Sequence, residues 1–193
     1  EGSGTSNGDI GLATSTDGIN FYKSATNPIL THGGGIEPAN IGTPSLYKEN
    51  GTWYLFYHGW DYTDCRICVA SGNSLTNLTK YGGNSIINTV SNTWESGTTG
   101  RRSAIFKEGS YYYMAYEGST EAPYSTAYWS SGVARSTNKL DWTKYPNNPV
   151  ISQLYGWGHD GPEMVKINNV YYLYVRQSVL TYGGTTSDRF RLE

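Results

Sequence analysis

The sequence predicts an all-β protein built from repeated four-stranded units. Three observations support this prediction: a composition poor in charge and rich in turn-forming residues, a long internal repeat without gaps, and hairpin signals inside the copies. Only 16% of the 193 residues are charged, while glycine contributes 24 residues and tyrosine 18. An average soluble domain carries about 25% charged residues. This mixture of glycine and aromatic residues is typical of short strands joined by many turns.

The internal repeat is visible in three segments that align without gaps. The stretches PSLYKENGTWYLFY, SAIFKEGSYYYMAY and PEMVKINNVYYLYV begin at residues 44, 103 and 162, so each copy follows the last after 59 residues. In the first copy Asn50-Gly51 separates two apolar runs, which is a strong signal for a β-hairpin. Each copy therefore predicts two antiparallel strands joined by a tight turn.

A second repeated phrase supplies two further strands. It reads LATSTDGINFYKSATNPIL at 12–30, VASGNSLTNLTKYGGNSII at 69–87 and VARSTNKLDWTKYPNNPVI at 133–151. Together the two phrases give units of four short strands, and such units at a spacing of about 40–60 residues are the signature of β-propeller blades. The second strand of a blade is packed on both faces, which accounts for the dense aromatic residues of 52–59.

The repeats predict that residues 1–193 form a single propeller domain or propeller segment. We expect a half blade at 9–30, whole blades at 44–87 and 103–151, and a partial blade at 162–192. This is a little over three repeats, whereas closed propellers have about 4–8 blades. We therefore expect the propeller to be incomplete in this chain, or completed by another chain or a second copy.

Composition also argues against several functions. A formal net charge of −2 without a basic run makes nucleic acid an unfavourable partner. We expect no membrane span, because no apolar stretch approaches the about 18 residues that one needs. Cys65 and Cys68 lie on a predicted strand and are interpreted as buried structural residues, since zinc would need a second pair of ligands. The composition is common among exported proteins, so we expect a secreted or extracellular protein, with the periplasm as the alternative.

Several phrases resemble the blades of the five-bladed β-propeller glycoside hydrolases, the superfamily of family 43 arabinanases and β-xylosidases and family 32 invertases and levanases. These phrases are IGLATSTDGINFYKSATNPIL, TPSLYKENGTWYLFYHG and RRSAIFKEGSYYYMAYEG, and the resemblance covers most of the chain. It implies a carbohydrate-active protein that cleaves glycosidic bonds of a polysaccharide or oligosaccharide by carboxylate acid–base catalysis. It also implies that the carboxylates lie near the start of the innermost strands, around the mouth of the central channel.

Three positions test how far the chain follows the pattern of that superfamily. Thr43 stands where an aspartate would precede the proline, and Arg102 stands in the aspartate position of an Arg-Asp-Pro motif whose arginine is kept as Arg101. Asp160 occupies the general-acid position of a Glu-x-Pro motif. Thr43 and Arg102 favour the alternative of a non-catalytic carbohydrate-binding or assembly propeller. A third hypothesis, a protein-interaction propeller, predicts an exposed apolar face instead of a polar aromatic cleft.

The candidate site residues are expected at one end of the blades. The first two strands of a blade are antiparallel neighbours, so the end of the second returns to the face where the first began. Glycoside hydrolysis needs two carboxyl groups, one protonated and one ionised. The candidates for catalysis are Asp160, Glu95 and Glu117. The candidates for substrate binding are His58, Arg101, Arg102, Trp129, Trp157, His159 and Arg176.

The tryptophans of this set would stack on the apolar faces of sugar rings. A rim of solvated ion pairs is the structural alternative for each charged candidate. We expect no cofactor and assign no metal ligand: the sequence contains no Asp-rich calcium loop, so a structural calcium ion is left open without assigned residues.

Overall fold

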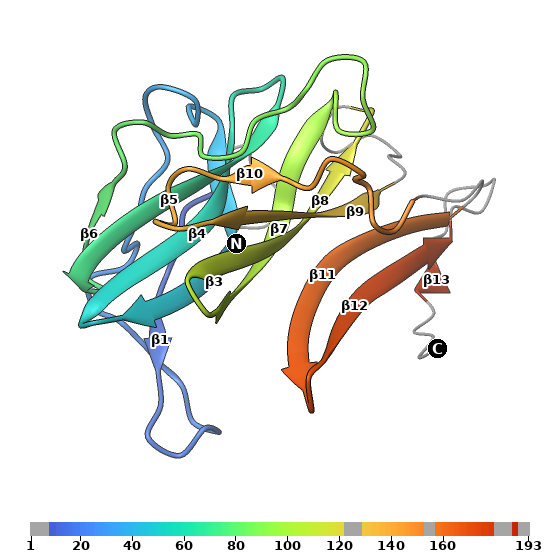
Figure 1. Ribbon diagram of the computed structural model, residues 1–193. Coiled ribbons are helices and arrows are strands. Elements are labelled where there is room, and N and C mark those ends of the chain that lie inside the picture. Colours follow the sequence, from blue (N-terminus) through green and yellow to red (C-terminus); the bar gives the residue numbers. More distant parts are fainter. Residues whose placement is uncertain (1–7, 122–128, 153–156, 180–186, 189–193) are drawn as a thin grey trace.

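The computed structural model describes residues 8–121, 129–152, 157–179 and 187–188. For residues 101–102, 157–160, 177–179 and 187–188 it describes the backbone alone. All regular structure in the described ranges is β-strand, arranged as four separate antiparallel sheets (Figure 1). The prediction of an all-β fold is confirmed.

Two sheets have four strands each, in chain order from one edge to the other. The first contains β3 (Asn40–Glu49), β4 (Thr52–Trp60), β5 (Cys65–Ser74) and β6 (Asn77–Lys80). The second contains β7 (Thr98–Glu108), β8 (Tyr111–Ser119), β9 (Ser130–Ser136) and β10 (Thr143–Lys144).

The remaining strands form two smaller sheets. One pairs β1 (Ala13–Thr14) with β2 (Tyr22–Lys23). The other contains β11 (Trp157–Ile167), β12 (Val170–Val179) and β13 (Ser187–Asp188).

The predicted hairpin at Asn50-Gly51 is confirmed. These two residues connect β3 to β4 with φ values of 48° and 79°, and Glu49 pairs with Thr52 across the turn. Positive φ at both central residues is what a type I′ turn requires, and its twist matches that of the flanking strands. Asn168 and Asn169 do the same between β11 and β12, with φ values of 49° and 64°.

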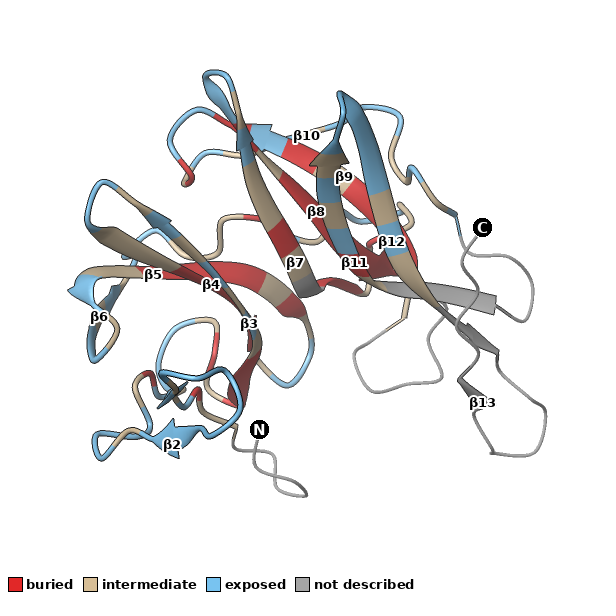
Figure 2. Ribbon diagram, turned by 90° about the horizontal axis from the view of Figure 1, so that it is seen from below, coloured by how far each residue is buried: buried red, intermediate tan, exposed pale blue. Residues whose placement is uncertain are grey.

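The sheets pack face to face like the blades of a propeller, with β3, β7 and β11 in contact along one side (Figure 2). Between the two four-stranded blades lies a core that includes Phe56, Ile67, Met114 and Tyr116, all fully buried. Phe56 meets Trp142 of the next blade edge to face, with ring centroids 6.3 Å apart. The dense aromatic residues of β4 therefore fill the space between blades, as the repeat predicts.

Both cysteines are buried, and Cys68 belongs to a second core cluster with Leu30 and Leu55. Cys65 and Cys68 are fully buried in β5 and form no disulfide. Burial, with the nearby Glu37 carboxylate, raises the pKa of the Cys68 thiol well above its usual range. The structural interpretation of the pair agrees with this environment.

A cluster of charged residues joins the two four-stranded blades at the end where β3 and β4 meet in their hairpin. The Glu49 carboxylate accepts hydrogen bonds from Lys107 at 2.6 Å and Lys139 at 2.9 Å, and also from the Tyr112 hydroxyl. One blade later Glu108 pairs with Lys166 at 2.5 Å. We call Glu49, Lys107, Tyr112 and Lys139 the Glu49 cluster.

The β11–β12 hairpin carries several exposed apolar side chains on one face, and Figure 2 shows much of this hairpin in the colour of exposed residues. It carries Val165, Ile167, Val170, Tyr172 and Tyr174, which are 39–51% exposed. In the preceding blade the corresponding face is covered, and Phe106 there contacts Tyr171 with ring centroids 5.7 Å apart. The equivalent face of the preceding blade packs against the next blade. The exposed face of the β11–β12 hairpin is therefore of the type that packs against a blade.

Candidate functional site

The candidate site is built on three β-bulges, one near the start of each of β3, β7 and β11. The pairing with the neighbouring strand shifts between Gly42 and Ser45, between Thr99 and Ser103, and between Asp160 and Glu163. A bulge re-aims the side chains of its residues, and bulges are common next to active sites. They hold Thr43, Arg102 and Gly161 at equivalent places in successive blades, and Arg101 lies beside Arg102 in the second bulge.

The ends of β4, β8 and β12 reach the same edge, as expected from antiparallel pairing. His58 pairs with Gly42 and Arg176 pairs with Asp160 in the strand register, and Glu117 lies opposite the bulge of β7. Three candidates from three different blades are thereby brought to one end of the sheets.

The first bulge is held by His58, a buried side chain that is 3% exposed. Its Nδ1 lies 2.8 Å from Thr43 Oγ1, and its Nε2 lies 3.0 Å from Asn40 Oδ1. Because the Asn40 oxygen can only accept, Nε2 donates to it, while the Thr43 hydroxyl can donate to Nδ1 or accept from it. These two contacts fix the orientation of Thr43, whose φ of 45° is unusual for a threonine.

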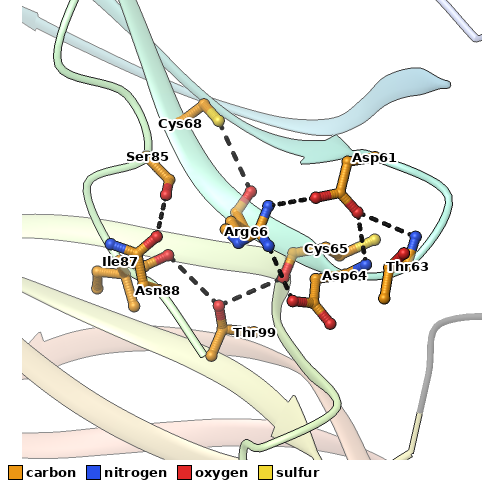
Figure 3. A network of polar contacts seen from close by, with 10 residues as sticks. All are labelled: Asp61, Thr63, Asp64, Cys65, Arg66, Cys68, Ser85, Ile87, Asn88 and Thr99. Atoms are coloured by element: carbon orange, nitrogen blue, oxygen red, sulfur yellow. Dashed lines mark hydrogen bonds and ion pairs between the residues drawn. The ribbon is translucent and has the colours of Figure 1, made fainter. Parts of the chain in front are cut away.

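The second bulge carries Arg101 and Arg102 and is anchored by the residues just before them. The Thr99 hydroxyl lies 3.4 Å from the carbonyl oxygens of Cys65 and Ile87 in the preceding blade, as Figure 3 shows. A Cβ atom at Gly100 would come within 1.9 Å of Ile67, and its φ is 69°, so only glycine fits. The backbone that leads into the two arginines is therefore fixed against the first blade.

The third bulge contains Gly161, which directly follows Asp160. Its N–H donates to Oε2 of Glu117 at 2.7 Å, a contact between the second and third blades. Glu117 is only 2% exposed. Trp157, His159 and Asp160 lie on β11 immediately before this bulge, where the structure describes their backbone.

Glu95 lies in an ion pair. Its Oε1 contacts Lys144 Nζ at 2.6 Å, the side chain is nearly buried, and Lys144 also donates to the Asn88 carbonyl at 2.6 Å. Burial, and then the Glu95 charge, raise the pKa of the adjacent Tyr116.

The preceding blade has the same arrangement, with Glu37 paired to Lys80 beside Tyr57, whose pKa is likewise raised by burial and neighbouring groups that include Glu37. An arrangement present in both four-stranded blades favours a structural role for Glu95, and its catalytic role stays a prediction.

The two remaining described candidates differ in their accessibility. Trp129 is 5% exposed just before β9, which does not favour stacking on a sugar. Arg176 is partly exposed on β12, directly across from Asp160 in the register.

A polar cluster in the loop between β4 and β5 was not among the predicted site residues. Arg66 donates to Asp61 at 2.6 Å and to Asp64 at 2.8 Å (Figure 3). Partial burial acts to raise the pKa of Asp61, but hydrogen bonds from the Asp64 N–H, Arg66 and the Thr63 N–H lower it overall. Asp61 is thus an anion with Arg66 as its counter-ion, unsuited to proton transfer at neutral pH.

The same loop exposes Tyr62, which is 61% accessible and packs beside Trp60 with ring centroids 5.6 Å apart. The spacing D-x-x-D-x-R after an aromatic strand end is the signal in the sequence that marks this loop. An exposed aromatic ring at this end of the blades is a surface on which a sugar can stack.

In the described ranges, no three His, Cys, Asp or Glu side chains lie close enough together to hold a metal ion. Those ranges also contain no helix long and apolar enough to cross a membrane.

Solved structures of glycoside hydrolases have the same fold. Zg3597, a family 117 glycoside hydrolase from the marine bacterium Zobellia galactanivorans, has a TM-score of 0.60 and 18% identity, with 93% of this chain and 54% of that chain covered. Fructan 1-exohydrolase IIa from Cichorium intybus has a TM-score of 0.66 and 16% identity, covering 90% and 34%. A thermostable family 43 glycoside hydrolase has a TM-score of 0.59 and 16% identity, covering 95% and 67%.

The chain thus spans about half the length of the family 117 enzyme. The comparison with curated proteins found no significant match. The resemblance to the five-bladed β-propeller glycoside hydrolases is confirmed in fold.

The sequence profile of one protein family also matches the chain. It matches residues 1–121 and is described as β-1,4-mannooligosaccharide phosphorylase. The matched segment includes the first two bulges and Glu117. Because it makes up more than half of the sequence, the chain belongs to glycoside hydrolase family 130.

Proposed function

We propose that the chain is the site-bearing part of an enzyme that cleaves β-1,4-linked mannooligosaccharides with inorganic phosphate as the acceptor. The description of the matching family supports the substrate class. The single observation that carries the choice of phosphate is the identity of the bulge residues: Thr43 and Arg102 stand where related hydrolases have aspartates.

The physical argument concerns the nucleophile. An inverting hydrolase needs a second carboxylate to deprotonate the attacking water. Phosphate is already an anionic nucleophile and needs no such base. A carboxylate about 4 Å from it would add repulsion of about 4 kcal/mol at an effective dielectric constant of about 20. A hydroxyl at Thr43 and a guanidinium at Arg102 remove that repulsion and supply hydrogen-bond donors.

The reaction then proceeds by a single displacement. A phosphate oxygen bonds to the anomeric carbon while the glycosidic C–O bond breaks and its electron pair stays on the leaving oxygen. Asp160, protonated, gives its proton to that oxygen as general acid. The products are a sugar 1-phosphate and an oligosaccharide shorter by one residue. Arg101, Arg102 and Arg176 are proposed to bind the phosphate, because guanidinium groups match phosphate oxygens in pairs.

His58 contributes through Thr43. The contact of 2.8 Å between His58 Nδ1 and Thr43 Oγ1 fixes the position of that hydroxyl before substrate arrives. A fixed donor or acceptor needs no reorganisation during the reaction.

The experiment supplies the full-length protein with β-1,4-mannotriose, with and without inorganic phosphate, and measures release of mannose 1-phosphate and mannose. We expect sugar phosphate only in the presence of phosphate, and a loss of about 10²–10⁴-fold in kcat for Asp160→Asn. Release of free mannose independent of phosphate would establish a hydrolase instead. Binding of mannotriose without any cleavage would support the non-catalytic carbohydrate-binding propeller.

A further inference from the structure

We propose that Glu117 is a positioning residue that fixes the backbone beside Asp160, and that it does not itself transfer a proton. This inference rests on the proposed function, in which Asp160 is the general acid. It starts from one contact: Oε2 of the buried Glu117 accepts the Gly161 N–H at 2.7 Å.

The contact meets a requirement of the bulge. Between Asp160 and Glu163, β11 has two residues opposite a single residue of β12, so part of its backbone leaves the ladder of hydrogen bonds. A buried backbone N–H without an acceptor costs about 1–3 kcal/mol. Gly161 also has a φ of 60°, a conformation that glycine adopts at little cost. Glu117 supplies the acceptor that holds this turn in place.

The first blade contains a related contact at equivalent positions. His58, which is 59 residues before Glu117, holds Thr43, which is 118 residues before Gly161. His58 holds the bulge of its own blade, whereas Glu117 extends from β8 to the first strand of the next blade. The carboxylate therefore sets the position of Asp160 relative to β7, which carries Arg101 and Arg102. In the proposed reaction these two places hold the general acid and the phosphate.

The contact with the Gly161 N–H does not favour Glu117 as a general acid. An N–H donor stabilises the ionised carboxylate, whereas a general acid must hold its proton near neutral pH. At 2% exposure the side chain is also shielded from a substrate in the channel mouth. A backbone held within a fraction of an ångström is what efficient catalysis needs, since a misplacement of about 1 Å can lower the rate by about 10²-fold.

The test compares E117Q and E117A in the full-length protein. Glutamine keeps an oxygen that accepts the Gly161 N–H, and alanine does not. We expect E117Q to keep kcat within about threefold and to keep the acid-dependent limb of the pH profile. We expect E117A to lower kcat by about 10–100-fold with little change in KM. A loss of about 10²–10⁴-fold in E117Q together with loss of that limb would make Glu117 a proton-transferring group and overturn the proposal.

Amide hydrogen exchange of the segment 157–167 gives a second measurement that does not depend on activity. We expect faster exchange at Gly161 in E117A and unchanged exchange in E117Q; equal exchange in all three proteins would refute the contact. If E117A does not fold, the pH profile and the amide exchange of E117Q decide whether Glu117 positions the backbone or transfers a proton. If the wild type is active and D160N has the same activity, the proposed function is refuted. The exchange result still tests the role of Glu117 in that case.

E37Q is the matched control. It changes a carboxylate of similar burial, 5% exposed, whose partner is Lys80 and not a bulge. We expect it to lower stability without altering the pH profile or the exchange at Gly161.

Discussion

The Glu49 cluster predicts an unequal contribution of two ion pairs that occupy equivalent places between blades. In the cluster one carboxylate faces Lys107, Lys139 and the Tyr112 hydroxyl, and the Lys139 side chain is only 8% exposed. In the next interface Glu108 faces Lys166, and these side chains are 41% and 25% exposed. The substitution E49Q removes the negative charge from the Glu49 cluster, and E108Q removes it from the pair of Glu108 with Lys166.

The size of the effect follows from burial. Removing one partner of a buried ion pair costs about 3–5 kcal/mol, because the other charge stays buried without compensation. Lys107 is 42% exposed, so water replaces part of its lost interaction. We therefore expect E49Q to lower the free energy of unfolding by about 2–3 kcal/mol. For E108Q the expected loss is at most about 1 kcal/mol, as for other exposed pairs.

The assay is equilibrium unfolding in urea at neutral pH, followed by tryptophan fluorescence and by circular dichroism. A loss of 2–3 kcal/mol corresponds to a fall in Tm of about 4–12 °C for a chain of this size. The reasoning is refuted if E49Q destabilises the protein no more than E108Q does.

The pH dependence gives a second check on the same variant. Hydrogen bonds from Lys107, Tyr112 and Lys139 lower the pKa of Glu49 from 4.5 to about 2. A carboxylate whose pKa is lower in the folded state stabilises the fold above its unfolded pKa and loses this contribution as pH falls through the folded pKa. The difference in stability between wild type and E49Q should therefore be full above about pH 5 and shrink toward pH 2.

Two further predictions concern the site and the core. Thr43→Asp restores a carboxylate beside the proposed phosphate position; we expect phosphorolysis to fall at least about tenfold, mainly through a higher KM for phosphate, while Thr43→Ser stays close to wild type. A Thr43→Asp variant with unchanged KM for phosphate would contradict the placement of the nucleophile. Burial raises the pKa of Cys68, so both buried thiols should react with a disulfide reagent only after unfolding; rapid labelling of the native protein would contradict the packing of β5.

Local signals and the repeat at a spacing of 59 residues were sufficient to predict the fold. The Asn50-Gly51 turn depends on two adjacent residues, and the strand pattern around it depends on alternation over a few positions. The Glu49 cluster could not be predicted from local signals, because Lys107 and Lys139 lie 58 and 90 residues away from Glu49 in the sequence. The same holds for Glu95: the sequence shows a carboxylate near the start of a strand, but Lys144, which neutralises it, follows 49 residues later. The secreted location, the blade boundaries and the roles of the site residues stay predictions.

The bulges explain why alignment of the repeats identified the positions of the site residues but not the contacts that hold them. Thr43, Arg102 and Gly161 correspond in the sequence, and each lies in a bulge of its first strand. Each blade keeps a bulge at this place, with two residues opposite one in β3 and β11 and three opposite one in β7, while the residue types differ. Structural needs are shared by equivalent positions, so they account for what the blades have in common, such as the pairs of Glu37 with Lys80 and Glu95 with Lys144.

Differences between equivalent positions need another explanation, and at the bulge end of the blades they change the chemistry of the side chain. A histidine, a glutamate and an arginine follow one another at 58, 117 and 176, and a threonine, an arginine and a glycine at 43, 102 and 161. A packing requirement shared by all blades would favour the same residue type at equivalent positions. It does not explain why these two sets of equivalent positions hold six residues of different chemistry. A single asymmetric ligand at the mouth does select them, because each blade meets a different part of it. The divergence of the repeat at this end is therefore itself an argument for a site.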